Sequence, residues 1–142
     1  REHGLDPYVI LHGARHGLEL DELFEHADFG IGSLGRHRSG ITHIKTLKNR
    51  EYAARGLAFA YSETDEDFDD KAYVMKIPAD ETAVDIDGIV AFCRSLPMTG
   101  REIRDSIGNL SWKCQMQKVL CEVVPCTKTP ALPVPPQNIR KI

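Results

Sequence analysis

No apolar run in this chain approaches the roughly 20 residues that cross a bilayer. The start of the chain also lacks the basic and then apolar segments of a secretion signal. An excess of positive charge is missing as well, because 18 lysines and arginines face 21 acidic residues and leave a formal net charge of −3. Without an overall positive field, duplex nucleic acid is a poor partner. We therefore expect a cytoplasmic protein with no transmembrane segment and no nucleic-acid partner.

Patterns of metal ligands are missing too. The cysteines include no Cys-x-x-Cys pair and have no histidine nearby at the spacing of a zinc site. The acidic stretch ETDEDFDD, residues 63–70, lacks the turn glycine and the closing glutamate of a calcium loop. We therefore expect reduced thiols, a solvated acidic loop and no metal. The cysteines are Cys93, Cys114, Cys121 and Cys126.

Short β-rich apolar runs alternate along the chain with segments whose apolar residues have helical spacing. Strands that are separated by helices cannot pair as hairpins, so the pattern predicts parallel strands with helices on both faces. The predicted fold class is α/β, a Rossmann-like three-layer α/β/α domain with a short parallel sheet. Strands are expected at residues 8–13, 29–33, 57–62 and 72–77. Helices are expected at residues 18–28, 44–55, 85–96, 99–107 and 111–123.

The composition predicts a compact domain followed by a tail. Hydrophobic residues make up 42% of the chain, which is enough for one ordinary core. Residues 125–142 carry five of the eight prolines and little that could pack. We expect a domain over residues 1–124 and an extended, proline-rich tail over residues 125–142. Because the sequence begins without methionine and almost directly in a predicted strand, we also expect it to be part of a longer protein.

Ligands of open parallel sheets bind outside the carboxyl ends of the strands. The loop GSLGRHRSG, residues 32–40, follows the second predicted strand and carries Arg36, His37 and Arg38. It then leads to a helix start, where free backbone N–H groups and the helix dipole favour negative charge. The loop is therefore a candidate phosphate site. The alternative is a solvated basic loop.

Lys48 and Glu51 lie near the start of the predicted helix 44–55, three residues apart and thus on one side of it. The simplest interpretation is a local ion pair. Alternatively, Lys48 contacts a phosphate while Glu51 accepts hydrogen bonds from a sugar diol, since a carboxylate can accept two hydroxyl protons. The spacing leaves both interpretations open.

Two segments resemble a known family. LKNREYAARGLAFAYS, residues 47–62, is similar to the stretch of GT-B-fold glycosyltransferases of group 1 (family 4-like) in which a lysine, a Glu-Tyr pair, an alanine, a glycine and a strand follow in order. HADFGIGSLGRHRSG, residues 26–40, resembles the approach to the donor site in that family. The likeness runs from about residue 8 to residue 123 and corresponds to the C-terminal, donor-binding half of the GT-B fold.

The resemblance implies a role for each matching residue. In this family the glutamate at the position of Glu51 holds the ribose hydroxyls. Lys48 and the backbone at Thr46 and Leu47 would hold the diphosphate of a nucleotide sugar. The sugar would be transferred to an acceptor hydroxyl, on a glycan or another compound, with the nucleotide sugar as co-substrate and no further cofactor.

Other features of the family extend this expectation. Many relatives carry a further glutamate toward the transferred sugar, and His43 stands at that position here, so His37 or Arg38 would contact the sugar or phosphate instead. Catalytic residues are expected mainly in an N-terminal GT-B domain of the same chain. The donor-binding half alone would then bind the nucleotide sugar without turnover, and the whole enzyme could lie peripherally on a membrane.

Two other functions stay open at this stage. A nucleotide-sugar epimerase of related fold would share the anion site but would act on the nucleotide sugar alone. A non-catalytic interaction module would use the basic loop and the acidic stretch as oppositely charged surface patches.

Overall fold

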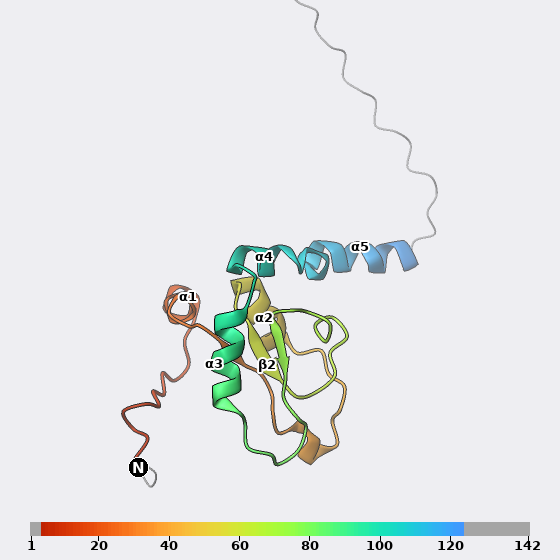
Figure 1. The fold of residues 1–142 in the computed structure, drawn as a ribbon. Helices are drawn as coiled ribbons and strands as arrows, with labels where there is room; N and C mark the ends of the chain where they lie inside the picture. Colours follow the sequence, from red (N-terminus) through yellow and green to blue (C-terminus); the bar gives the residue numbers. More distant parts are fainter. Residues whose placement is uncertain (1–3, 124–142) are drawn as a thin grey trace, which may run out of the picture. The chain divides into compact units, whose positions relative to one another are not determined.

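A computed structural model of the chain describes residues 4–123. These residues form a mixed α/β structure with five α-helices and a three-stranded parallel sheet (Figure 1). Contacts divide the chain into two units, Arg1–Gly108 and Asn109–Ile142, and each is described by itself. The first unit contains the sheet and the helices α1 to α4. The second contains α5, Trp112–Val123, which the sequence predicted as a helix.

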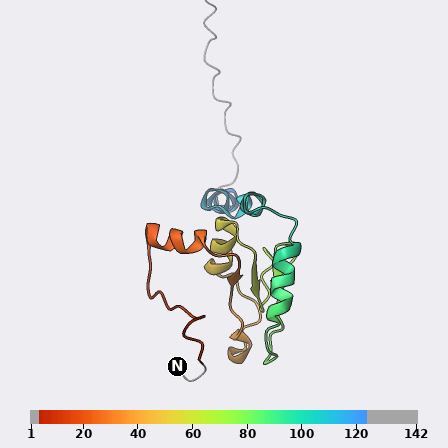
Figure 2. The same ribbon diagram turned by 60° about the vertical axis from the view of Figure 1, so that its left-hand side comes forward.

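The sheet confirms the prediction of parallel strands. Its strands are β1 (Gly30–Ile31), β2 (Phe59–Tyr61) and β3 (Val74–Lys76), in the order β1-β2-β3. The central strand β2 is fully buried, as expected for a strand covered on both faces. Figure 2 shows the strands between α2 and α3. This arrangement is compatible with a Rossmann-like fold.

The first unit has helices at the four predicted places. They are α1 (Gly17–Glu25), α2 (Leu47–Arg55), α3 (Ile86–Ser95) and α4 (Gly100–Asp105). At the start of α4 a capping box is present, with the Thr99 side chain accepting from the Glu102 N–H and the Glu102 side chain accepting from the Thr99 N–H.

Gly56 ends α2 in the left-handed conformation, with φ of 79°. A Cβ atom at this position would lie 2.4 Å from the carbonyl oxygen of Gly100, at the start of α4. Glycine is therefore required both by the backbone conformation and by the close approach of α2 to α4.

The strand predicted over residues 8–13 is wrong. The segment contains no strand, and its apolar side chains are exposed, up to 90% for Leu11. The N–H groups of Tyr8 and Val9 donate to the carbonyl oxygen of Leu5, at 2.8 and 3.0 Å. A local turn has taken the donors that a sheet would need, and among the described residues no strand pairs with this segment.

Two further expectations concern the C-terminal tail and transmembrane segments. The predicted tail, residues 125–142, lies outside the described residues, so the boundary near residue 124 stays a prediction. Across residues 4–123, none of the helices combines the length and apolar character needed to span a bilayer.

Candidate functional site

The loops that follow β1 and β2 meet at the carboxyl edge of the sheet. Both the backbone N–H and the hydroxyl of Ser62 donate to the carbonyl oxygen of Ser33, each at 3.2 Å. Beyond β2, Thr64 donates to the carbonyl oxygen of Thr42 at 2.7 Å and accepts from the N–H of Ile44 at 3.0 Å. These bonds extend the sheet by one short parallel segment and bring the start of α2 to this edge.

The N-terminus of α2 offers free hydrogen-bond donors. The hydroxyl of Thr46 accepts from the N–H of Asn49 at 3.3 Å and thereby caps the helix. The N–H groups of Leu47 and Lys48 have no acceptor within the helix, as in any first helical turn. Both side chains are exposed, and among the described residues Lys48 has no charged partner. The first turn of α2 therefore presents N–H groups and an unpaired cation to the surface.

Glu51 pairs with Arg55 rather than with Lys48, so the local ion pair suggested by the spacing is not formed. One oxygen, Oε1, accepts from Nε and Nη2 of Arg55, both at 3.3 Å. Arg55 also donates from Nη1 to Asp21 of α1 at 2.7 Å, and its guanidinium lies 4.2 Å from the ring centroid of Phe24. Arg55 is thus held from three sides and fixes one carboxylate oxygen of Glu51.

The basic loop is not simply solvated, because it binds a carboxylate of the same chain. Arg36–Ser39 form the short 3-10 helix η1. From it, Arg38 makes a two-pronged contact with Glu81, with Nε donating to Oε1 at 2.7 Å and Nη2 donating to Oε2. His37 Nε2 lies 2.9 Å from the same Oε1. A forked guanidinium–carboxylate pair has the geometry that arginine uses for phosphate.

The Arg38 guanidinium, and after it the His37 ring, lower the pKa of Glu81 to about 2. The depressed pKa means that the carboxylate stays charged and paired at neutral pH, and that the pairing is lost only as the pH falls through that value. Glu81 therefore occupies, under ordinary conditions, the basic side chains that a bound phosphate would need.

Replacing Glu81 with glutamine should increase the affinity of the chain for inorganic pyrophosphate. The exposed ion pair contributes little, so a gain of about two- to fivefold is expected. Calorimetric titration at low salt measures it, and added salt should reduce the gain. Asp70→Asn, at an exposed acid of the 63–70 stretch, is the matched control. An unchanged or weaker affinity in Glu81→Gln would show that the pair does not compete with anions.

The acidic stretch 63–70 is only partly solvated, which corrects the expectation of a solvated loop. Asp65 is 0% exposed. Its Oδ2 accepts from Nη1 of Arg50 at 3.1 Å and from Nδ2 of Asn49 at 3.4 Å. No sequence pattern indicates this cluster, since its members belong to separate elements. Glu63 is buried as well, with 3% exposure, and Phe68 is fully buried.

Sequence reasoning also missed the glycines of GIGSLG, residues 30–35, whose spacing is that of the Gly-x-Gly-x-x-Gly dinucleotide fingerprint. A Cβ at Gly30 would lie 2.7 Å from the Tyr52 ring, and one at Gly32 would lie 2.9 Å from the carbonyl oxygen of Ala60. The fingerprint requires an α-helix after the last glycine, but only the four residues of η1 follow Gly35. The first two glycines therefore serve close packing.

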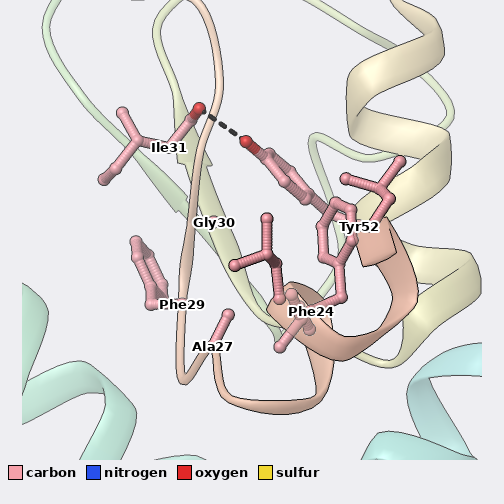
Figure 3. A pocket seen from close by; sticks show the side chains of 9 residues that line it. Phe24, Ala27, Phe29, Gly30, Ile31 and Tyr52 are labelled. Carbon is pink, nitrogen blue, oxygen red and sulfur yellow. Dashed lines mark hydrogen bonds between the residues drawn. The ribbon is translucent and has the colours of Figure 1, made fainter. Parts of the chain in front are cut away.

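An apolar cavity of about 240 Å³ lies between α1, β1 and α2 (Figure 3). Tyr52 points along one side and its hydroxyl donates to the carbonyl oxygen of Ile31 at 2.9 Å. Burial raises the pKa of this hydroxyl. Tyr52 thus packs against the edge of the sheet, and the lining of the cavity contains no carboxylate, histidine, lysine or arginine. Its lining consists of Leu20, Leu23, Phe24, Ala27, Phe29, Gly30, Ile31, Tyr52 and Leu57.

His43 lies in the short segment beside Thr64, with which it forms an isolated parallel bridge. Its Nδ1 lies 2.9 Å from the hydroxyl of Thr42, and the side chain is exposed. The histidine thus belongs to the extension of the sheet at the carboxyl edge. Within residues 4–123, no three histidine, cysteine or acidic side chains are grouped so that they could hold a metal ion.

The chain was compared with protein-family models, with curated proteins and with solved structures, and none of the three comparisons gave a match.

Proposed function

We propose that the chain is the donor-binding domain of a glycosyltransferase that transfers a sugar from a nucleotide diphosphate to an acceptor hydroxyl. In this proposal the parallel sheet is the core of a Rossmann-like, three-layer domain, the C-terminal half of a GT-B fold. The acceptor and any general base would belong to an N-terminal domain of the same enzyme.

One observation carries the proposal. The first turn of α2 offers free N–H groups and the unpaired cation Lys48 at the carboxyl edge of a parallel sheet, and the carboxylate of Glu51 follows three residues later on the same helix. A diphosphate suits the helix start, because N–H dipoles and a cation both attract negative charge. A sugar diol suits Glu51, whose carboxylate can accept from both hydroxyls. A nucleoside diphosphate carries both groups, the diphosphate and the ribose diol, in one molecule.

Arg55 supports the assigned role of Glu51. Both of its contacts with Glu51 go to Oε1 and leave Oε2 with no partner among the described residues. The guanidinium therefore orients the carboxylate while one oxygen stays available for ribose hydroxyls. A fixed acceptor costs less conformational entropy on binding than a free glutamate.

The proposed chemistry of this domain is electrostatic. As the bond between sugar and diphosphate breaks, negative charge grows on the leaving phosphate. The N–H groups of Leu47 and Lys48, the ammonium of Lys48 and the guanidinium of Arg38 would stabilise that charge more strongly in the transition state than in the bound donor. For this, Arg38 would first release Glu81 and then bind the phosphate.

The proposal is tested by locating the binding of nucleoside diphosphates on the chain. Backbone amide chemical shifts of the 15N-labelled, 142-residue chain are followed during titration with UDP, GDP and ADP. We expect saturable shifts at residues 46–49 and 33–40, because these amides lie nearest the phosphates. Pyrophosphate should shift the same helix start, while the uncharged nucleosides should shift it much less. If no diphosphate gives saturable shifts, or if the shifts cluster away from these residues, the assignment is wrong.

A further inference from the structure

Glu63 is a buried carboxylate at the same edge of the sheet, and the proposed function gives it no role. It follows β2 after Ser62, and its side chain is 3% exposed. Its backbone carbonyl accepts a hydrogen bond from Lys76 of β3, while Thr64, the next residue, holds the segment of residues 42–44. The backbone of Glu63 is therefore fixed between two neighbouring elements.

The carboxylate itself lacks a hydrogen-bond partner. Its Oε1 is buried and accepts no hydrogen bond from any described residue. The nearest cation is Arg36, whose Nε lies 3.7 Å away, beyond hydrogen-bond distance, and donates instead to the hydroxyl of Ser33 at 3.2 Å. A buried carboxylate oxygen without a donor is costly, and most such oxygens in proteins are satisfied.

The surroundings restrict what could satisfy this oxygen. A phosphate would be repelled by the carboxylate. A metal ion would need further ligands, and residues 4–123 contain no suitable group. A hydroxyl group can donate a hydrogen bond to such an oxygen without bringing a like charge. Arg36, with 40% of its side chain exposed, is the side chain that would move aside to admit it.

We propose that Glu63 accepts a hydrogen bond from a hydroxyl of the sugar in the nucleotide-sugar donor. The inference rests on the proposed function, since it takes the diphosphate to lie at the start of α2. From that position the ribose extends toward Glu51, and the sugar on the other phosphate extends over the loops after β1 and β2, where Glu63 lies. Arg36, released from its place beside Glu63, would keep its hydrogen bond to Ser33.

A second buried atom at this edge is also without a partner. The Oδ1 of Asn49, a side chain with 2% exposure, accepts no hydrogen bond from the described residues. It lies against Gly32, where an added Cβ would approach it to 3.1 Å. Two buried acceptors at this edge, Asn49 Oδ1 and Glu63 Oε1, are therefore without a donor among the described residues, and each calls for a partner from outside the chain.

The test compares each nucleoside diphosphate with its sugar conjugate by calorimetry on the 142-residue chain. The pairs are UDP with UDP-glucose, GDP with GDP-mannose and ADP with ADP-glucose. Compared with the parent chain, Glu63→Gln should bind the sugar nucleotide about tenfold more weakly, because a charged acceptor is lost. Its affinity for the diphosphate should stay within about twofold of the parent's. Asp70→Asn, in the same acidic stretch but exposed, should change neither.

Glu63→Asp is a second variant. It keeps the carboxylate but shortens the side chain by one methylene. This variant should also lower the affinity for the sugar nucleotide more than the affinity for the diphosphate. Thermal unfolding checks that each variant is folded. If the parent binds diphosphates but both variants bind the conjugates as the parent does, or lose both ligands equally, Glu63 is a structural residue and only this inference fails. If the parent binds no diphosphate, the proposed function fails as well.

Discussion

Replacing Arg50 with methionine should lower the free energy of unfolding by about 3–5 kcal/mol, the usual cost of removing one partner of a buried ion pair. Asp65 is fully buried, and Arg50 donates to its Oδ2 at 3.1 Å. After the replacement, the Asp65 carboxylate would keep, within residues 4–123, only the neutral donors Asn49 Nδ2 and the N–H of Asp67. Two neutral hydrogen bonds do not compensate a buried negative charge.

Arg50 makes other contacts that the replacement would also remove. Its Nη1 donates to the carbonyl oxygen of Thr46 at 3.0 Å, its Nη2 donates to Asp67, and its guanidinium lies 5.4 Å from the centroid of the Phe68 ring. The arginine therefore connects the first turn of α2 to the acidic stretch. Its loss should loosen the edge of the sheet where we place the ligand.

Urea unfolding at neutral pH measures this effect. Arg101→Met is the matched control, because Arg101 is 87% exposed and its contact with Asp105, at 3.8 Å, should contribute less than about 1 kcal/mol. Adding Asp65→Asn to Arg50→Met should recover part of the stability by removing the unpaired charge. A loss below about 1 kcal/mol for Arg50→Met would mean that Asp65 does not depend on its arginine.

Features that depend on neighbouring residues were predictable from the sequence. The helix α2 ends at Arg55, as the predicted range 44–55 requires, because Gly56 follows it and the left-handed position after a helix favours glycine. The capping box at Thr99 and Glu102 needs only a spacing of three residues. In both cases the determining interactions lie within a few residues, so a linear pattern contains them.

The remaining features depend on contacts between distant parts of the chain. Arg38 and Glu81 are separated by 43 residues, and Arg50 and Asp65 by 15, so no local pattern pairs them. The run at residues 8–13 has the composition of a strand, but a strand also requires a neighbour, and a turn to Leu5 has taken its first donors. Composition predicts a preference, whereas pairing is decided by the fold.

Removing the carboxylate of Glu51 should lower the affinity for nucleoside diphosphates about ten- to hundredfold, because hydrogen bonds to a charged acceptor contribute about 1.5–3 kcal/mol. In our proposal the free Oε2 receives the ribose hydroxyls and Arg55 holds Oε1. Glu51→Ala removes the acceptor and also releases Arg55, which still has Asp21 as a partner. The helix should therefore remain folded.

The central claim is that α2 binds a nucleoside diphosphate and that Glu51 accepts hydrogen bonds from its ribose. Calorimetric titration of the parent chain, Glu51→Ala and the control Glu22→Ala tests this claim most directly. Glu22 is an exposed carboxylate of α1, and no role in binding is proposed for it. The account predicts binding of at least one of UDP, GDP and ADP by the parent and by Glu22→Ala, and an affinity about ten- to hundredfold weaker for Glu51→Ala. Absence of binding by the parent, or equal binding by parent and Glu51→Ala, would contradict it.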